Sequence, residues 1–147
     1  RIEFLTVEFG CYGNFHCKST FIRMSLLQLE GTPKTPKVEF IDSPLSLALS
    51  GRSIPENSIE FYRPLMDWID EYLSPENSGQ VEVSIRLEYF NTSSSKCLMD
   101  LLKRIEKSPA DATILWYYED EDEDMLEAGE DYDAIIDIPF RLIATSA

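Results

Sequence analysis

The clearest regularity in the chain is an alternation of hydrophobic and polar positions between residues 81 and 89. Hydrophobic residues occupy every second position, and polar residues lie between them: Val81, Val83, Ile85, Leu87 and Tyr89 against Glu82, Ser84, Arg86 and Glu88. This period of two predicts a β-strand with one buried face and one face in water. We therefore expect a sheet whose helices gather mainly on one face.

Two amphipathic helices are predicted by apolar residues at helical spacing. The first follows Asn57, which has capping-box spacing with Glu60, and its apolar positions are Tyr62, Leu65, Met66, Ile69 and Leu73. Pro64 either kinks this helix or begins its regular part. The second follows Asn91 and runs to about Lys107, with apolar positions at Leu98, Leu101, Leu102 and Ile105.

The remaining segments predict a mixed sheet. Two short apolar runs, residues 38–41 and 45–49, flank the turn-forming Asp42, Ser43 and Pro44 and predict a hairpin. Residues 113–118 predict a second central strand, which the second helix connects in parallel to the first. Residues 119–133 predict a short helix or turn closed by Gly129, and residues 135–143, interrupted by Pro139, predict an edge strand. The predicted fold class is α/β.

The length of 147 residues suits one domain with its own core. Residues 1–23 differ from the rest because they are aromatic and irregular and contain two of the three cysteines and the only histidine. From Met24 onward the sequence looks like an ordinary cytoplasmic start. Our hypothesis is that residues 1–23 are non-native or weakly ordered and that residues 24–147 form the domain.

Charge excludes some classes of partner. The chain has 27 acidic against 13 basic residues and a formal charge of -14, which disfavours nucleic acid and anionic membranes. It contains no apolar run near the roughly 18 residues that span a bilayer, and three cysteines do not make a disulfide framework. A reduced, cytoplasmic protein is expected. Ten acids and no base lie between Glu119 and Asp133, which makes this stretch either a solvated edge or a surface for a basic partner.

Residues that could carry catalysis or bind metal are sparse. The sequence has no glycine-rich phosphate loop, and Cys11, His16 and Cys17 have poor spacing for zinc and lack a fourth ligand. Cys97 falls beside core positions of a helix and is predicted to be a buried, inert thiol. We expect no metal, no cofactor and no enzymatic activity; a small hydrolase that uses carboxylates of the acidic stretch is the alternative.

The acidic stretch suggests a calcium site, but it does not match the motif of a calcium-binding loop. Asp120, Asp122 and Asp124 have the one-three-five spacing of a helix-flanked calcium loop, but Met125 stands where that loop needs glycine.

The stretch from Tyr89 to Ser95 is the most informative in the chain. It places four consecutive hydroxyl side chains where a central strand ends and a helix begins. Such hydroxyls either cap the helix or form a phosphoacceptor or anion site, because free backbone N–H groups at a helix start favour negative charge.

Three stretches resemble the SiaC-type biofilm regulatory phosphoproteins, a family of single-domain bacterial regulators. They are SIPENSIEFYRPLMDWIDEYL, LEYFNTSSSKCLMDLLKRIE and WYYEDEDEDMLEAGEDYDAIIDIPF. They lie within residues 24–143, and the first 23 residues have no counterpart. The resemblance implies a STAS-like fold, similar to anti-anti-sigma domains, with a mixed sheet and helices mainly on one face.

The resemblance also implies a partner-switching function. In such systems a Ser/Thr kinase phosphorylates the protein on a threonine and a PP2C-like phosphatase removes the phosphate. The unphosphorylated form activates a diguanylate cyclase, and cyclic-di-GMP then promotes biofilm formation. The family's threonine falls on Thr92, with Ser93 and Ser94 as alternatives. A module of the same fold with another output, such as an anti-sigma factor, is the competing interpretation.

Six residues are predicted to contact protein partners: Asn91, Thr92, Ser93, Pro55, Glu56 and Asn57. The last three, followed by Ser58, precede the first helix, match the family and are expected to flank Thr92. Capping of that helix alone is the alternative for these four residues.

Overall fold

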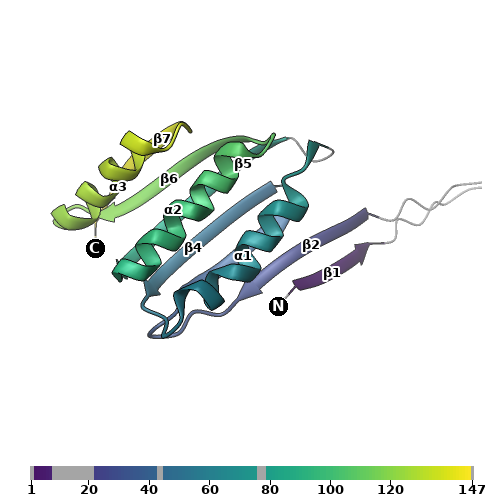
Figure 1. Cartoon of the computed structure of the whole chain (residues 1–147), viewed down its shortest axis with the longest axis horizontal. Helices are drawn as coiled ribbons and strands as arrows, with labels where there is room; N and C mark the ends of the chain where they lie inside the picture. Colours follow the sequence, from purple (N-terminus) through teal and green to yellow (C-terminus); the bar gives the residue numbers. More distant parts are fainter. Residues whose placement is uncertain (1, 8–21, 43–44, 76–78, 147) are drawn as a thin grey trace, which may run out of the picture.

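The computed structural model describes residues 2–7, 22–42, 45–75 and 79–146 of the chain. In these residues seven strands form one sheet in chain order, and three helices pack on it (Figure 1). The strands are β1 (Ile2–Val7), β2 (Ile22–Leu29), β3 (Lys37–Asp42), β4 (Leu45–Ser53), β5 (Gln80–Phe90), β6 (Asp111–Glu119) and β7 (Phe140–Thr145). The helices are α1 (Ser58–Tyr72), α2 (Thr92–Lys107) and α3 (Glu123–Ile135).

The sheet has an antiparallel half and a parallel half. Strands β1 to β4 pair antiparallel, and β4 to β7 pair parallel, each parallel step crossing over through one helix. The predicted hairpin of β3 and β4 and the predicted crossover from β5 through α2 to β6 are both confirmed; the turn residues Ser43 and Pro44 lie outside the described residues.

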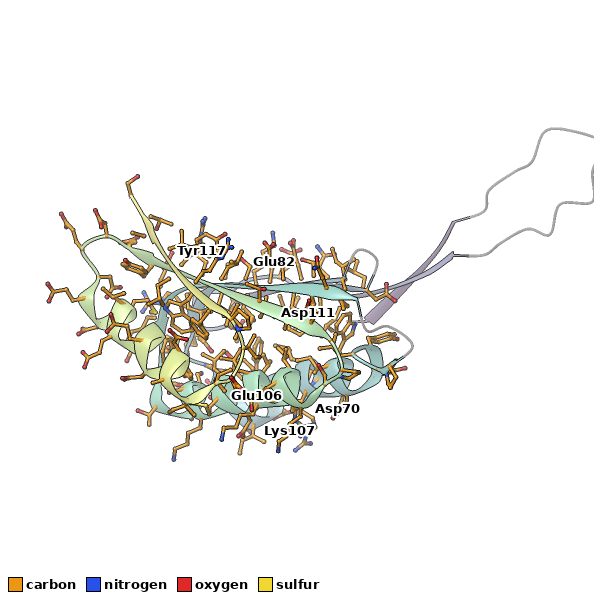
Figure 2. All side chains as sticks on the ribbon, turned by 90° about the horizontal axis from the view of Figure 1, so that it is seen from above. Asp70, Glu82, Glu106, Lys107, Asp111 and Tyr117 are labelled. Carbon is orange, nitrogen blue, oxygen red and sulfur yellow. The ribbon has the colours of Figure 1, made fainter. Side chains whose placement is uncertain are left out.

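The helices cover one face of the sheet, as the alternation in β5 predicts. Figure 2 shows Asp70, Glu106 and Lys107 on the helix side and Glu82 and Tyr117 on the opposite side. The core lies between the two layers, where the apolar positions of β5 meet α1 and α2. The predicted α/β class with helices on one face is confirmed. None of the three described helices is long and apolar enough to cross a membrane.

The end of β5 departs from strict alternation. Tyr89 was expected on the buried face, but its exposed fraction is 52%. The register between β4 and β5 shifts at Gly51 and Arg52, so Gly51 pairs with Leu87 and Arg52 with Tyr89. Gly51 has a φ of 103°, which glycine adopts readily. The extra residue in β5, Glu88, turns Tyr89 outward, and Phe90, which is partly buried, packs against the core.

Helix α1 runs without a break from Ser58 through Pro64, so the proline does not begin its regular part. The region after β6 differs from prediction. Most of the acidic stretch, from Glu123 onward, belongs to a helix of 13 residues, and Gly129 lies within α3 instead of closing it. The helix continues to Ile135, so β7 begins at Phe140, after Pro139. The expected edge position of this strand is confirmed.

The N-terminal hypothesis stays a prediction. Strand β1 pairs with β2, which itself begins at Ile22. Residues 8–21, including Cys11, His16 and Cys17, lie outside the described residues.

Candidate functional site

The three helices begin at one edge of the sheet. Because β4, β5 and β6 are parallel and each is followed by a helix, the starts of α1, α2 and α3 gather at the carboxyl ends of these strands (Figure 1). In open α/β sheets this edge is the usual place for binding, because loops there converge on a rigid frame.

Side chains of the preceding residues cap these helix starts. Asn91 Oδ1 accepts a hydrogen bond from the backbone N–H of Ser94 at 2.8 Å, and Asn57 Oδ1 accepts one from the N–H of Glu60 at 3.1 Å. Both caps satisfy N–H groups that have no partner within the helix. The predicted capping by Asn57 is confirmed. The backbone N–H of Asn91 donates to the carbonyl of Ser53 at 3.0 Å, which joins the start of α2 to the end of β4.

Buried hydroxyls connect these two segments beneath the surface. Ser53 Oγ donates to Ser94 Oγ at 2.9 Å, and Ser94 Oγ donates to the carbonyl of Ser53 at 3.0 Å. Tyr62 OH lies 2.6 Å from Ser53 Oγ. A hydroxyl has one proton, and Ser53 gives its proton to Ser94, so Tyr62 is the donor to Ser53. All three side chains are fully buried, and burial raises the pKa of Tyr62 to about 12.

A second set of hydroxyls lies closer to the surface. Ser58 Oγ lies 2.7 Å from Ser93 Oγ and 3.4 Å from Ser94 Oγ. Ser93 Oγ donates to Asn91 Oδ1 at 3.1 Å. We call the connected groups the hydroxyl cluster: Ser53, Ser58, Tyr62, Asn91, Ser93 and Ser94. It holds the starts of α1 and α2 together, so this corner has little freedom to rearrange.

Helix α3 also contacts the start of α2. Tyr132 OH donates to the carbonyl of Ser95 at 2.9 Å and lies 3.0 Å from its hydroxyl oxygen. Burial raises the pKa of Tyr132, so the phenol stays a donor at neutral pH.

Thr92 is the first residue of α2 and is exposed. Among the described residues its hydroxyl has no hydrogen-bond partner, whereas Ser93, Ser94 and Ser95 all have one. The predicted phosphoacceptor is therefore a free hydroxyl beside a capped helix start.

Three of the other predicted contact residues lie in the segment between β4 and α1. Pro55 is buried, Glu56 is exposed and lies 3.9 Å from Lys34 Nζ, and Asn57 is exposed. The contact between Ser58 and Ser93 brings this segment next to the start of α2.

The sequence reasoning missed Ser53, Tyr62 and Tyr132 as parts of this site, and it noted Tyr62 only as an apolar helix position. It did group Ser58 with Pro55, Glu56 and Asn57 beside the first helix, but it did not predict the hydrogen bond of Ser58 to Ser93.

The acidic stretch begins α3 at the same edge. Asp122 Oδ1 accepts from the backbone N–H of Met125 at 3.0 Å, and Glu123 and Asp124 lie in the first turn, where negative charge is favourable. In the part of the chain that the structure describes, no three His, Cys, Asp or Glu residues form a group that could hold a metal ion.

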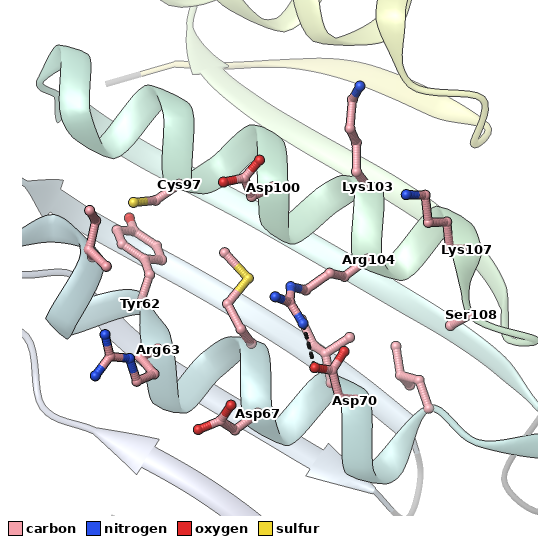
Figure 3. Close-up of a pocket in the computed structure, with 14 residues that line it drawn as sticks. Tyr62, Arg63, Asp67, Asp70, Cys97, Asp100, Lys103, Arg104, Lys107 and Ser108 are labelled. Carbon is pink, nitrogen blue, oxygen red and sulfur yellow. Dashed lines mark hydrogen bonds and ion pairs between the residues drawn. The ribbon is translucent and has the colours of Figure 1, made fainter.

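A groove of about 920 Å³ runs between α1 and α2 (Figure 3). Its wall includes Tyr62 of the hydroxyl cluster and four basic side chains, Arg63, Lys103, Arg104 and Lys107. Arg104 forms an ion pair with Asp70 across it. Both partners are about half exposed, so the pair contributes about 0 to 1 kcal/mol.

Cys97 also lines this groove. It is buried as predicted, and burial, helped by the nearby Asp100 carboxylate, raises the pKa of its thiol. The thiol form is the less reactive one, which agrees with an inert side chain.

The fold and this corner define the class of the protein: a STAS-like α/β domain with a hydroxyl-bearing helix start at the carboxyl edge of its parallel strands. The model of the SiaC family regulatory phosphoprotein matches residues 29–145. The chain belongs to this SiaC family, which confirms the resemblance seen in its sequence.

Individual relatives agree with this assignment. An uncharacterized protein of Pseudomonas aeruginosa strain UCBPP-PA14 is 32% identical over 124 residues, covering 82% of this chain and 98% of the relative. A chain in the crystal structure of diguanylate cyclase SiaD in complex with its activator SiaC from Pseudomonas aeruginosa is 31% identical, with a TM-score of 0.74. That alignment covers 81% of this chain and 99% of the other. SiaC of Pseudomonas aeruginosa is 30% identical with a TM-score of 0.73, covering 82% of this chain and 98% of the other.

Proposed function

We propose that this protein is a non-enzymatic, cytoplasmic regulator whose unphosphorylated form binds and activates a diguanylate cyclase. A Ser/Thr kinase phosphorylates Thr92 and thereby stops the binding, and a PP2C-like phosphatase restores it. The related complex of SiaD with its activator SiaC supports the choice of a cyclase as partner. The free, exposed hydroxyl of Thr92 on a rigid corner carries the choice of the switch residue.

The physics of the site supports a switch that acts on docking and leaves the fold intact. A phosphate adds about two negative charges at pH 7. At an exposed helix start it gains about 0.3 to 1 kcal/mol from the helix dipole. Because the Thr92 hydroxyl makes no hydrogen bond with a described residue, modifying it breaks no hydrogen bond within the described part of the chain. The new charge and bulk instead obstruct a partner that must cover this corner.

The proposed contact surface is the corner around Thr92. It consists of Asn91, Thr92 and Ser93 at the start of α2, together with Pro55, Glu56 and Asn57 before α1. The distance of 2.7 Å between Ser58 and Ser93 supports treating the two segments as one surface.

A phosphorylation assay tests the switch residue. Incubation with the cognate kinase and ATP should add one phosphate, about 80 Da, and tandem mass spectrometry should place it on Thr92. Thr92→Ala should remove at least nine-tenths of the incorporation. A wild-type protein that takes no phosphate within residues 91–95 would contradict the proposal.

A binding assay tests the output. The cyclase that co-purifies with the unphosphorylated protein should bind Thr92→Glu at least tenfold more weakly than wild type, as measured by biolayer interferometry. Gln80→Glu adds the same charge at the opposite end of the parallel strands, where Gln80 is exposed, and should bind like wild type. Equal affinities for all three proteins would show that Thr92 is not the switch. Recovery of an anti-sigma factor in place of a cyclase would contradict the proposed output.

A further inference from the structure

The hydroxyl of Ser93 is held on two sides. Its proton goes to Asn91 Oδ1 at 3.1 Å, and its oxygen lies 2.7 Å from Ser58 Oγ. Because Ser93 has already given its only proton to Asn91, Ser58 must donate to Ser93. The Ser93 oxygen therefore faces the start of α1 and has a lone pair occupied.

Ser58 cannot easily release this bond. It is the first residue of α1, only 4% exposed, and fixed there by the Asn57 cap. Its second hydroxyl neighbour, Ser94, is 3.4 Å away, and the Ser94 oxygen already accepts a closer hydrogen bond from Ser53 at 2.9 Å. Ser93 is thus the only close acceptor for Ser58 within the cluster.

The four consecutive hydroxyls of residues 92–95 differ in how accessible they are to an enzyme that transfers phosphate. Thr92 is exposed and unbonded among the described residues, Ser94 is fully buried, and Ser95 contacts Tyr132. Ser93 is the exception, because the residue itself is exposed and only its hydroxyl is held back. Its two hydrogen bonds are therefore what prevents Ser93 from acting as a second phosphate acceptor.

We propose that Ser58 is a specificity-determining residue that confines phosphorylation to Thr92 by holding the Ser93 hydroxyl inward. This inference rests on the proposed function, since it presumes a kinase that reaches this corner. In the transfer, the acceptor oxygen forms a bond to the γ-phosphorus of ATP, the bond from that phosphorus to ADP breaks, and the hydroxyl proton passes to a base of the kinase. Attack requires an oxygen and a proton that are free to react. Within the described part of the chain both are free on Thr92, whereas the Ser93 oxygen accepts from Ser58 and its proton is bonded to Asn91.

The test compares four proteins with the cognate kinase and ATP, with phosphate located by tandem mass spectrometry. Wild type should carry phosphate on Thr92 alone, and Thr92→Ala should lose at least nine-tenths of the incorporation. Ser58→Ala should take phosphate on both Thr92 and Ser93. The double variant Ser58→Ala/Thr92→Ala should regain at least fivefold more phosphate than Thr92→Ala, all of it on Ser93.

The control is Ser53→Ala, alone and with Thr92→Ala. It removes a buried hydroxyl of the same cluster that has no hydrogen bond to Ser93, so it should not direct phosphate to Ser93. Phosphate on Ser93 in this control would show that general loosening, and not the bond from Ser58, opens the site.

Failure of the inference is distinct from failure of the proposed function. If wild type is phosphorylated on Thr92 but the folded double variant takes no more phosphate than Thr92→Ala, Ser58 has no such role. If wild type takes no phosphate in this stretch, the proposed function itself is wrong. Should Ser58→Ala unfold below assay temperature, Ser58→Cys replaces it, because a thiol has nearly the same shape and is a weaker donor.

Discussion

Gly129 allows α3 to lie close to the sheet. A Cβ atom at this position would stand 2.6 Å from both Leu142 Cδ2 and Trp116 Cδ1. Trp116 is itself fixed, since it is fully buried and its Nε1 donates to the carbonyl of Met125 at 3.0 Å. Glycine often marks the end of a helix, which is why the sequence predicted one here. Gly129 instead lies inside α3, where any side chain would collide with Trp116 and Leu142.

Gly129→Ala should destabilise the protein. Alanine improves helix propensity by about 1 kcal/mol, but overpacking against a fixed tryptophan costs about 1 to 3 kcal/mol. We expect a net loss on the order of 1 kcal/mol in the free energy of unfolding, measured by urea denaturation. Gly79→Ala is the control, because no atom lies within 4 Å of its added Cβ, and it should change stability by less than about 0.5 kcal/mol. Equal stabilities would refute the packing argument.

Tyr62 makes stability depend on alkaline pH. Its folded pKa of about 12 exceeds the unfolded value of 10.0, so the folded state holds the phenol proton more tightly. The corresponding stability is fully present below pH 10 and is lost as the pH rises toward 12, by up to about 3 kcal/mol. Urea denaturation at pH 8 and pH 11 should show a smaller drop for Tyr62→Phe than for wild type. Tyr89→Phe, which alters an exposed ring, should behave like wild type; an identical drop in Tyr62→Phe would contradict the assignment.

At the scale of elements, helix α2 depends on its cap. Asn91 Oδ1 accepts from the N–H of Ser94 and from the hydroxyl of Ser93, so one oxygen supports both the helix and the hydroxyl cluster. Loss of this oxygen leaves two donors to find other partners.

Asn91→Ala should lower the free energy of unfolding by about 1 to 2 kcal/mol, because it removes a cap and leaves the Ser93 hydroxyl without its acceptor. Asn91→Asp retains an acceptor oxygen and adds a charge that the helix start favours, so its stability should stay close to wild type. Thermal and urea unfolding of the three proteins would decide this. An Asn91→Asp protein as unstable as Asn91→Ala would mean that capping is not what Asn91 supplies.

The same elements show what a sequence can and cannot predict. The starts of α1 and α2 were predictable because a cap joins residues three positions apart, as in Asn57 and Glu60. The bond from Ser53 to Ser94 joins residues 41 positions apart, and no local pattern contains it. The exposure of Tyr89 was missed for a similar reason, since it depends on the register between β4 and β5, which shifts between Gly51 and Arg52. Residue types therefore predicted the location of the site, but only the fold arranged its hydroxyls.

At the scale of the whole molecule, charge is unevenly distributed. Ten acids and no base lie between Glu119 and Asp133, at and after the end of β6. The groove between α1 and α2, in contrast, has four basic side chains in its wall against three acidic ones, Asp67, Asp70 and Asp100. Repulsion within the acidic stretch should oppose folding at low ionic strength.

Salt should therefore stabilise this protein. Raising NaCl from about 20 mM to 200 mM shortens the screening length from about 20 Å to about 7 Å, and we expect a gain on the order of 1 kcal/mol in the free energy of unfolding. Replacing Glu121 and Glu127, two acids of this stretch, by glutamine should reduce the gain. Replacing the groove bases Lys103 and Lys107 by glutamine should increase it. A salt response unchanged in both double variants would show that the acidic stretch is not its source.

The long-range hydrogen bond between Ser53 and Ser94 can form only after the chain has folded, so the arrangement of this corner depends on whether the molecule is folded. Closing it requires that the end of β4 and the start of α2, which are far apart in the sequence, have come together. The backbone amide of Ser94, once bonded to Asn91, should then exchange with deuterium only when the whole chain opens. In a nascent or heat-damaged chain the four hydroxyls of residues 92–95 are equivalent to any enzyme that meets them. The distribution of phosphate along these residues would thus record whether a molecule was folded when it was modified.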